Sequence, residues 1–147
     1  MKSLRNIFFL LGLLLSASQI KAQNTANTEF LPKHKIVMQL TSADPLVHKG
    51  LIKQLNNLKN GWKDSVIIEV VCHGPGMDFL NKDKTTAADD IDKLIGRGIQ
   101  FIACENSMRE RNIPKELVLP KINFVVMGIG EIVIKQEQGW SYIKAGF

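Results

Sequence analysis

The strongest constraint on the fold is the regular alternation of strand-like and helix-like segments along the chain. Short apolar runs rich in β-branched residues alternate about five times with stretches whose apolar residues recur at helical spacing. Runs that are apolar on both faces, such as SVIIEVVC at 65–72, are typical of strands covered on both sides. This alternation favours a parallel sheet with helices on both of its faces. We therefore expect an α/β fold.

The strand-like runs are short and end in turn-forming or helix-starting residues. They cover residues 35–40, 65–72, 99–104, 122–128 and 140–146. A helix is predicted after the first run, because Asp44 is a favoured N-cap residue and Pro45 suits the first helical position. Asn60 and Gly61 are expected to end this helix.

Two further helices are predicted from capping boxes. In a capping box, the hydroxyl of the N-cap residue accepts a hydrogen bond from the backbone N–H three residues later, and the side chain of that later residue accepts one from the N-cap N–H. The pairs Thr86 with Asp89 and Ser107 with Glu110 fit this pattern. A last helix is predicted from the apolar spacing that leads up to Gly139. Each predicted helix therefore follows one of the predicted strands.

The N-terminus has the pattern of a secretory signal peptide. Lys2 and Arg5 precede the apolar run 7–15, and small and polar residues follow it. Cleavage is expected after Ala22, with Ala17 as the alternative site. The run is shorter than the roughly 20 residues of a membrane-spanning helix. We expect a periplasmic or secreted protein with no membrane span.

The signal peptide at 1–22 accounts for much of the basic charge. Removing its three basic residues leaves 16 Lys and Arg against 14 Asp and Glu, so the net charge falls from +5 to +2. Without a basic cluster, no nucleic-acid partner is expected. Residues 23–34 form a polar, patternless segment that we expect to be disordered, and residues 35–147 have the length of one domain.

Cys104 and His73 are the leading candidates for chemistry, because each lies at the end of a predicted strand. Ligands of open parallel sheets gather outside the carboxyl ends of the strands. Cys104 lies three residues before the predicted N-cap Ser107, and the start of a helix favours the nucleophilic thiolate over the thiol. Alternatively, Cys104 is a small core residue. His73 is either a proton partner of the thiol or an exposed loop residue.

The sequence HGPG, which starts at His73, predicts a tight turn. Pro75 presets one backbone torsion, and Gly76 accepts the positive torsion that a type II turn requires. Such a turn, with Gly74 and Gly76, can direct N–H groups at an anion. The alternative interpretation is that Gly and Pro simply end the strand.

The chain has two cysteines, so a disulfide between Cys72 and Cys104 is a third possibility in an oxidising compartment. No CxxC or HxxxH spacing predicts a metal site. The segment GIGEI at 128–132 lacks both the phosphate-loop lysine and the dinucleotide fingerprint. No metal and no cofactor are therefore expected.

Several motifs in order resemble one family. They are VVCHGPG, then LIGRGIQFIACENSM, then VVMGIGEI, then KQEQGWSYIKAG. Together they resemble the DsrE/DsrF-like sulfur-relay superfamily, specifically its small single-domain branch, and the likeness runs from about Lys35 to the C-terminus.

This resemblance implies a three-layer α/β/α sandwich with a mostly parallel five-stranded sheet, assembled as a homotrimer or homohexamer. It also implies that a cysteine at the position of Cys104 carries sulfur as a persulfide between partner proteins. The expected partner is then an unidentified sulfur donor or acceptor protein. Relay members work in a reducing cytoplasm, whereas this chain has an export signal.

Two functional hypotheses follow. In the first, an exported protein handles sulfur or thiols through Cys104, and the N–H groups at Glu105, Asn106 and Ser107 stabilise its thiolate, with His73 as proton partner. In the second, a non-catalytic oligomeric module binds a small anion or a partner peptide at the strand ends and the HGPG turn, and Cys104 only packs. The residues alone indicate no conventional enzyme class.

Overall fold

Five parallel strands form the central sheet of the protein. The computed structural model describes residues 34–146. The strands are β1 His34–Leu40, β2 Val66–Cys72, β3 Ile99–Cys104, β4 Asn123–Val125 and β5 Ser141–Lys144. Their order is β4-β3-β2-β1-β5, and every neighbouring pair is parallel. This sheet confirms the predicted α/β fold.

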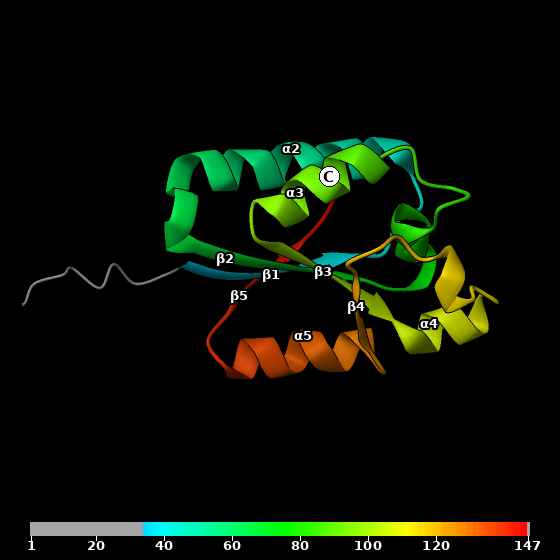
Figure 1. Cartoon of the computed structure of the whole chain (residues 1–147). Coiled ribbons are helices and arrows are strands. Elements are labelled where there is room, and N and C mark those ends of the chain that lie inside the picture. Colours follow the sequence, from blue (N-terminus) through cyan, green and yellow to red (C-terminus); the bar gives the residue numbers. More distant parts are fainter. Residues whose placement is uncertain (1–33, 147) are drawn as a thin grey trace, which may run out of the picture. The chain divides into compact units, whose positions relative to one another are not determined.

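Helices cover both faces of the sheet (Figure 1). On one face lie α2 Pro45–Trp62 and α3 Ala88–Gly96, and on the other lies α5 Gly128–Glu137. The short helix α4 Glu105–Glu110 directly follows β3. Three 3-10 helices complete the secondary structure: η2 Lys63–Ser65, η3 Gly74–Leu80 and η4 Lys115–Leu117.

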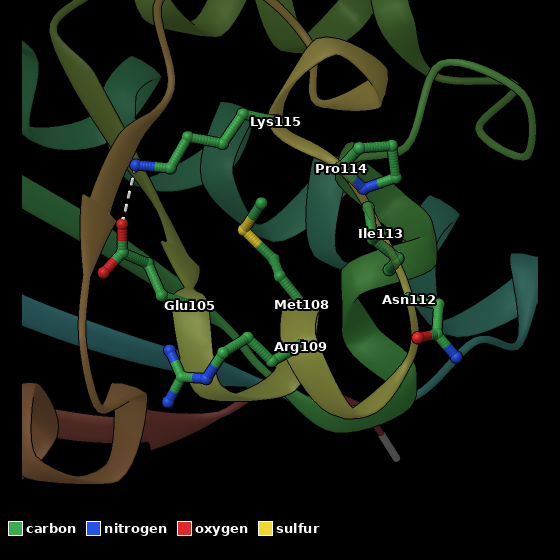
Figure 2. A pocket seen from close by; sticks show the side chains of 7 residues that line it. All are labelled: Glu105, Met108, Arg109, Asn112, Ile113, Pro114 and Lys115. Atoms are coloured by element: carbon green, nitrogen blue, oxygen red, sulfur yellow. Dashed lines mark ion pairs between the residues drawn. The ribbon is translucent and has the colours of Figure 1, made fainter.

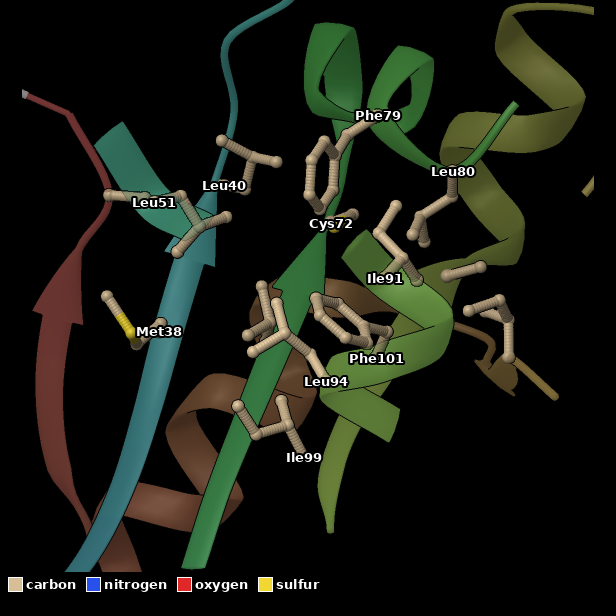
Figure 3. Close-up of a cluster of buried hydrophobic side chains, with 14 of the residues drawn as sticks. Met38, Leu40, Leu51, Cys72, Phe79, Leu80, Ile91, Leu94, Ile99 and Phe101 are labelled. Atoms are coloured by element: carbon tan, nitrogen blue, oxygen red, sulfur yellow. The ribbon is translucent and has the colours of Figure 1, made fainter. Parts of the chain in front are cut away.

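The two faces of the sheet are packed unequally. The larger core lies under α2 and α3 and includes Leu51, Phe79 and Phe101 (Figure 3). Burial of each such side chain contributes about 1.5–3 kcal/mol. The smaller core lies under α5 and consists of Val37, Val71, Ile102 and Ile132. Because side chains alternate along a strand, neighbouring residues of β2 and β3 belong to different cores.

The first helix starts where the sequence predicts and ends later. Asp44 caps α2, with its Oδ1 accepting a hydrogen bond of 2.8 Å from the N–H of Leu46. However, α2 continues through Asn60 and Gly61. The left-handed residue that ends it is Lys63, with φ of 48°.

Neither capping box forms as predicted. Helix α3 begins at Ala88 without a side-chain cap, and the hydroxyl of Thr85, not that of Thr86, accepts a hydrogen bond from Ala87 N–H. Helix α4 begins at Glu105, so Ser107 lies inside its first turn. Ser107 cannot be the cap because its hydroxyl is hydrogen-bonded to a distant turn instead.

The last two strands are shorter than predicted. β4 has three residues, because Val126 and Met127 leave the sheet and α5 begins at Gly128. β1 begins at His34, one residue earlier than predicted.

The predicted signal peptide lies outside the described residues. Between residues 34 and 146, no helix is both long and apolar enough to cross a membrane.

Candidate functional site

Cys104 lies where β3 passes directly into α4, and it is the N-cap residue of that helix. Its side chain is on the face covered by α5, because Ile102, two residues earlier in β3, belongs to the smaller core. The Sγ atom accepts a hydrogen bond of 3.2 Å from the N–H of Gly128, the first residue of α5. The starts of two helices therefore meet at one sulfur.

Ser107 connects this sulfur to the turn after β2. Its Oγ accepts a hydrogen bond of 2.8 Å from the N–H of Gly74, and its hydroxyl lowers the pKa of the Cys104 thiol. Ser107 is buried, which is unusual for a serine in the first turn of a helix. The hydrogen bond from Gly74 explains why a polar side chain is placed there.

The surroundings of Cys104 favour its thiolate. Burial by itself would raise the pKa of the thiol, since only 4% of the residue is exposed. Hydrogen bonds from the Ser107 hydroxyl and from the N–H groups of Ser107, Gly128 and Asn106 outweigh this effect, and the pKa lies below its ordinary value. The groups that lower the pKa are all uncharged donors.

The HGPG turn has a different structure from the one predicted. Gly74 has the positive torsion, with φ of 52°, whereas Gly76 lies within η3. The N–H of Gly76 donates to the His73 carbonyl, that of His73 to Leu40, and that of Gly74 to Ser107. All three donors of the turn are thus used within the chain. Anion binding by Gly74 and Gly76 stays a prediction, and the geometry gives both glycines a structural role.

Gly76 is required for close packing rather than for a positive torsion. A Cβ atom there would lie 2.1 Å from the backbone oxygen of Leu40. The absence of a side chain allows η3 to pack on the end of β1.

His73 lies next to Cys104, but its ring is engaged elsewhere. Its Nε2 is 2.7 Å from the side-chain nitrogen of Gln39 on β1. Burial lowers the pKa of His73, so the ring is neutral near pH 7. Among the described residues, no hydrogen bond joins this ring to Cys104. The role of His73 as proton partner stays a prediction.

The side chains of Glu105 and Asn106 interact with neighbouring cations instead of the sulfur. Glu105 forms an ion pair of 2.8 Å with Lys115, and Asn106 accepts a hydrogen bond from Arg109. Lys115 lowers the pKa of Glu105. The backbone N–H of Asn106 also lowers the pKa of Cys104, although its hydrogen bond goes to the Val126 carbonyl oxygen at 3.1 Å.

Cys72 lies on the opposite face of the sheet from Cys104. It belongs to the larger core and is fully buried, which raises the pKa of its thiol. In the register between β2 and β3, Cys72 pairs with Ala103, so Cys104 is displaced by one residue and points the other way. Both cysteines are free. This geometry contradicts the disulfide that the sequence left possible, because the two side chains diverge.

A separate groove lies beside α4, with a volume of about 640 Å³. Met108 points into it, and the ion pair between Glu105 and Lys115 spans one side (Figure 2). The remaining lining residues are Arg109, Asn112, Ile113 and Pro114. Cys104 does not line this groove. Across residues 34–146, no group of three His, Cys, Asp or Glu residues is placed to hold a metal ion.

Sequence reasoning missed three residues of this region: Gly128, Gln39 and Tyr142. Gly128 begins the segment GIGEI, which lacks a nucleotide-binding pattern, yet its N–H reaches the sulfur. The available signal was a glycine directly at a strand-to-helix junction on the edge where Cys104 lies. Gln39 and Tyr142 carry no such local signal.

Comparison with known proteins gives a consistent result. The sequence model of the DsrE/DsrF-like family matches residues 47–145. A solved structure of a protein of unknown function, MTH1491 from Methanobacterium thermoautotrophicum, is 32% identical with a TM-score of 0.72, and the match covers 76% of this chain and 98% of that one. A protein of unknown function, BT1422 from Bacteroides thetaiotaomicron, shares the fold at 20% identity and a TM-score of 0.59, over 75% of this chain and 93% of that one. No curated protein matches this chain.

Proposed function

The chain belongs to the DsrE/DsrF-like family, and from this premise we propose that it handles sulfur or thiols through Cys104, as a persulfide or a mixed disulfide. The observation that supports this role is the set of donors around one sulfur. The N–H of Gly128 donates a hydrogen bond to Sγ of Cys104, and the Ser107 hydroxyl lowers the pKa of its thiol. A thiolate is the attacking species in sulfur exchange, and these donors stabilise it.

The proposed step needs no oxidant. The Cys104 thiolate attacks the outer sulfur of a persulfide R–S–SH, the S–S bond of the donor breaks, and Cys104–S–SH forms while RS⁻ leaves. An acceptor thiolate then attacks the outer sulfur in the same way and releases Cys104 as a thiolate. Attack of Cys104 on a disulfide R–S–S–R gives the mixed disulfide and RS⁻. Charge and atoms balance in each step.

Access to the sulfur is from the segment that joins β4 to α5. Sγ lies 4.0 Å from the Val126 carbonyl oxygen, and Val126 and Met127 are 65% and 54% exposed. We propose that the donor or acceptor approaches across these two residues. Cys104 itself is nearly buried, so the proposed approach requires a displacement of this segment.

We also propose that the protein is exported and forms a homotrimer or homohexamer. The signal-peptide pattern before Ala22 supports export to the periplasm or beyond. The exposed apolar side chains support assembly, because all the large ones among the described residues except Leu46 and Trp62 lie between residues 124 and 143.

The groove beside α4 favours a second candidate function, that of a binding module without sulfur chemistry. It combines an apolar floor at Met108 with Arg109 and with the ion pair between Lys115 and Glu105. Such a groove suits an apolar ligand that carries an anionic group. In this case Cys104→Ala retains ligand binding, whereas Met108→Lys abolishes it.

The decisive experiment is sulfur loading of the reduced protein. The protein is incubated with a low-molecular-weight persulfide, alkylated, and analysed by peptide mass spectrometry. We expect one additional sulfur, removable by reductant, on the peptide that contains Cys104. Cys104→Ser is expected to abolish loading.

Cys72→Ala is the matched control, since it removes the other cysteine of the chain, which is fully buried. This variant is expected to load sulfur as the unmodified protein does. Loading of the Cys104→Ser protein, or a Cys104 thiol that reacts no faster than a free model thiol, would contradict the proposal.

A further inference from the structure

A chain of hydrogen bonds runs across three strands toward the Cys104 site. The Tyr142 hydroxyl on β5 donates to Oε1 of Gln39 on β1, and Nε2 of Gln39 lies 2.7 Å from Nε2 of His73, which follows β2. All three side chains lie on the α5 face of the sheet, as the strand alternation with Val37 and Val71 shows.

The chemistry of these groups determines where the imidazole proton lies. An amide nitrogen only donates, and an amide oxygen only accepts. Oε1 of Gln39 faces the Tyr142 hydroxyl and its Nε2 faces His73, so the phenol donates to Gln39. Nε2 of His73 must then accept, and a neutral ring carries its single proton on Nδ1.

His73 and Cys104 both border Gly128. A Cβ atom at Gly128 would lie 3.1 Å from the Cβ of Cys104 and 3.2 Å from the Cβ of His73. The two side chains therefore start side by side at Gly128, and no hydrogen bond joins the imidazole to the sulfur. Half-buried and neutral, it can offer a donor to a molecule that reacts there.

We propose that Gln39 and Tyr142 are positioning residues that hold His73 as a neutral imidazole with its proton on Nδ1, available to the sulfur that leaves the donor. This inference rests on the proposed function of Cys104. As the S–S bond of the donor breaks, negative charge develops on RS⁻, and a fixed N–H group stabilises that charge. Because the His73 ring is uncharged, it can stabilise the leaving RS⁻ without changing the charge next to the Cys104 thiolate.

The first test is the tautomer of His73, read from the ¹⁵N and ¹H chemical shifts of the histidine rings. The protein contains its own reference, because Nε2 of His48 lies 2.7 Å from the Ser42 carbonyl oxygen and must carry a proton. We expect His48 in the Nε2–H form and His73 in the Nδ1–H form. An Nε2–H form of His73 would overturn the proposal, since it means that the Gln39 amide is reversed.

The second test is the variant Gln39→Glu, which replaces the amide donor with an acceptor of almost the same shape. The new carboxylate raises the pKa of the imidazole, so the variant is studied at a pH at which the ring is neutral, and His73 is expected there in the Nε2–H form. Sulfur uptake from a persulfide is expected to slow by about tenfold, the effect of one lost hydrogen bond in the transition state. Alkylation of Cys104 by iodoacetamide, measured at the same pH with the thiol ionised, is expected to keep its rate, because iodide leaves without a hydrogen bond.

Controls separate the positioning role from general damage and from the function of Cys104. Tyr142→Phe frees the Gln39 amide and is expected to give a mixture of His73 tautomers, whereas the exposed Gln136→Glu on α5 is expected to change nothing. If Gln39→Glu changes the tautomer but not the uptake rate, the positioning role is overturned and the role of Cys104 stands. If Cys104→Ser still takes up sulfur, the proposed function itself fails, whatever the tautomer of His73.

Discussion

The backbone N–H of Gly128 donates a hydrogen bond of 3.2 Å to the sulfur of Cys104. Because Gly128 is the first residue of α5, the position of an entire helix affects one thiol. A side chain at this position would press on Cys104, His73 and Val71 at once, at 3.1 to 3.2 Å. The reactivity of the cysteine therefore depends on how closely α5 packs on the sheet.

Replacing Gly128 with alanine is expected to raise the pKa of Cys104. The added methyl group moves the start of α5 by a few tenths of an ångström and lengthens the hydrogen bond to the sulfur. We expect alkylation near pH 7 to slow roughly fivefold, which corresponds to about 1 kcal/mol for one hydrogen bond. The pH dependence of iodoacetamide modification measures this change. Gly130→Ala is the control, because its methyl group meets only the flexible end of Met127, and an equal effect in both variants would contradict the prediction.

The two cysteines are expected to give opposite pH dependences of stability. In Cys72→Ala, the remaining Cys104 ionises more easily in the folded state, so the free energy of unfolding rises with pH until about 8.5, where the unfolded thiol also ionises. In Cys104→Ala, the buried Cys72 keeps its proton when folded, so the free energy of unfolding falls as the pH rises above about 8.5.

Urea unfolding of both variants between about pH 6 and pH 10 tests these signs. Subtracting one curve of unfolding free energy from the other removes the contributions of the titrating groups that both variants share. Curves that run parallel over this range would show that neither thiol has a shifted pKa.

Replacing Gly76 with alanine is expected to destabilise the fold by at least ~2 kcal/mol. The new Cβ would meet the Leu40 carbonyl oxygen at 2.1 Å, and backbone atoms must move to relieve this contact. Gly61→Ala is the matched control, because Gly61 lies in α2 with free space around it and gains helix propensity of about 0.5 kcal/mol. Thermal unfolding of the two variants should therefore shift in opposite directions.

Replacing Lys135 with methionine is expected to cost about 3 kcal/mol of stability. Lys135 Nζ lies 2.7 Å from Oε2 of Glu69, which is 2% exposed, and the other oxygen of Glu69 has no hydrogen-bond partner. Burial already raises the pKa of Glu69, and loss of the lysine leaves its charge uncompensated.

The control for Lys135 is Lys121→Met, which removes an ion pair with Asp92 in which both side chains are 62% exposed. Such surface pairs contribute at most about 1 kcal/mol. Urea unfolding at neutral pH compares the two variants. Equal losses of stability in the two variants would mean that the buried pair of Lys135 and Glu69 contributes no more than an exposed pair.

The order of the elements could be predicted because its signals are local. Asp44 and Pro45 correctly marked the start of α2, and the β-branched run that ends in Cys72 correctly marked β2. Cys104 was also correctly placed at the carboxyl edge of the sheet, since a strand must end where its apolar run ends. These predictions required no knowledge of distant contacts.

The contacts at the candidate site could not be predicted, because they join residues far apart in the chain. Ser107 fits a capping box locally, but Gly74, 33 residues away, takes its hydroxyl. Whether Cys72 and Cys104 face each other depends on the register between β2 and β3, and no residue within either strand specifies a shift of one position. The Gly128 contact depends on how α5 packs, which the segment GIGEI does not encode by itself.

The placement of Cys72 and Cys104 on opposite faces of the sheet has a consequence for redox chemistry. These are the only two cysteines in the sequence, so the folded chain contains no resolving thiol for Cys104. An adduct on Cys104 cannot be released as an internal disulfide, and its lifetime depends on the thiols that surround the protein. A persulfide or mixed disulfide on Cys104, as proposed above, would therefore exchange only with other molecules.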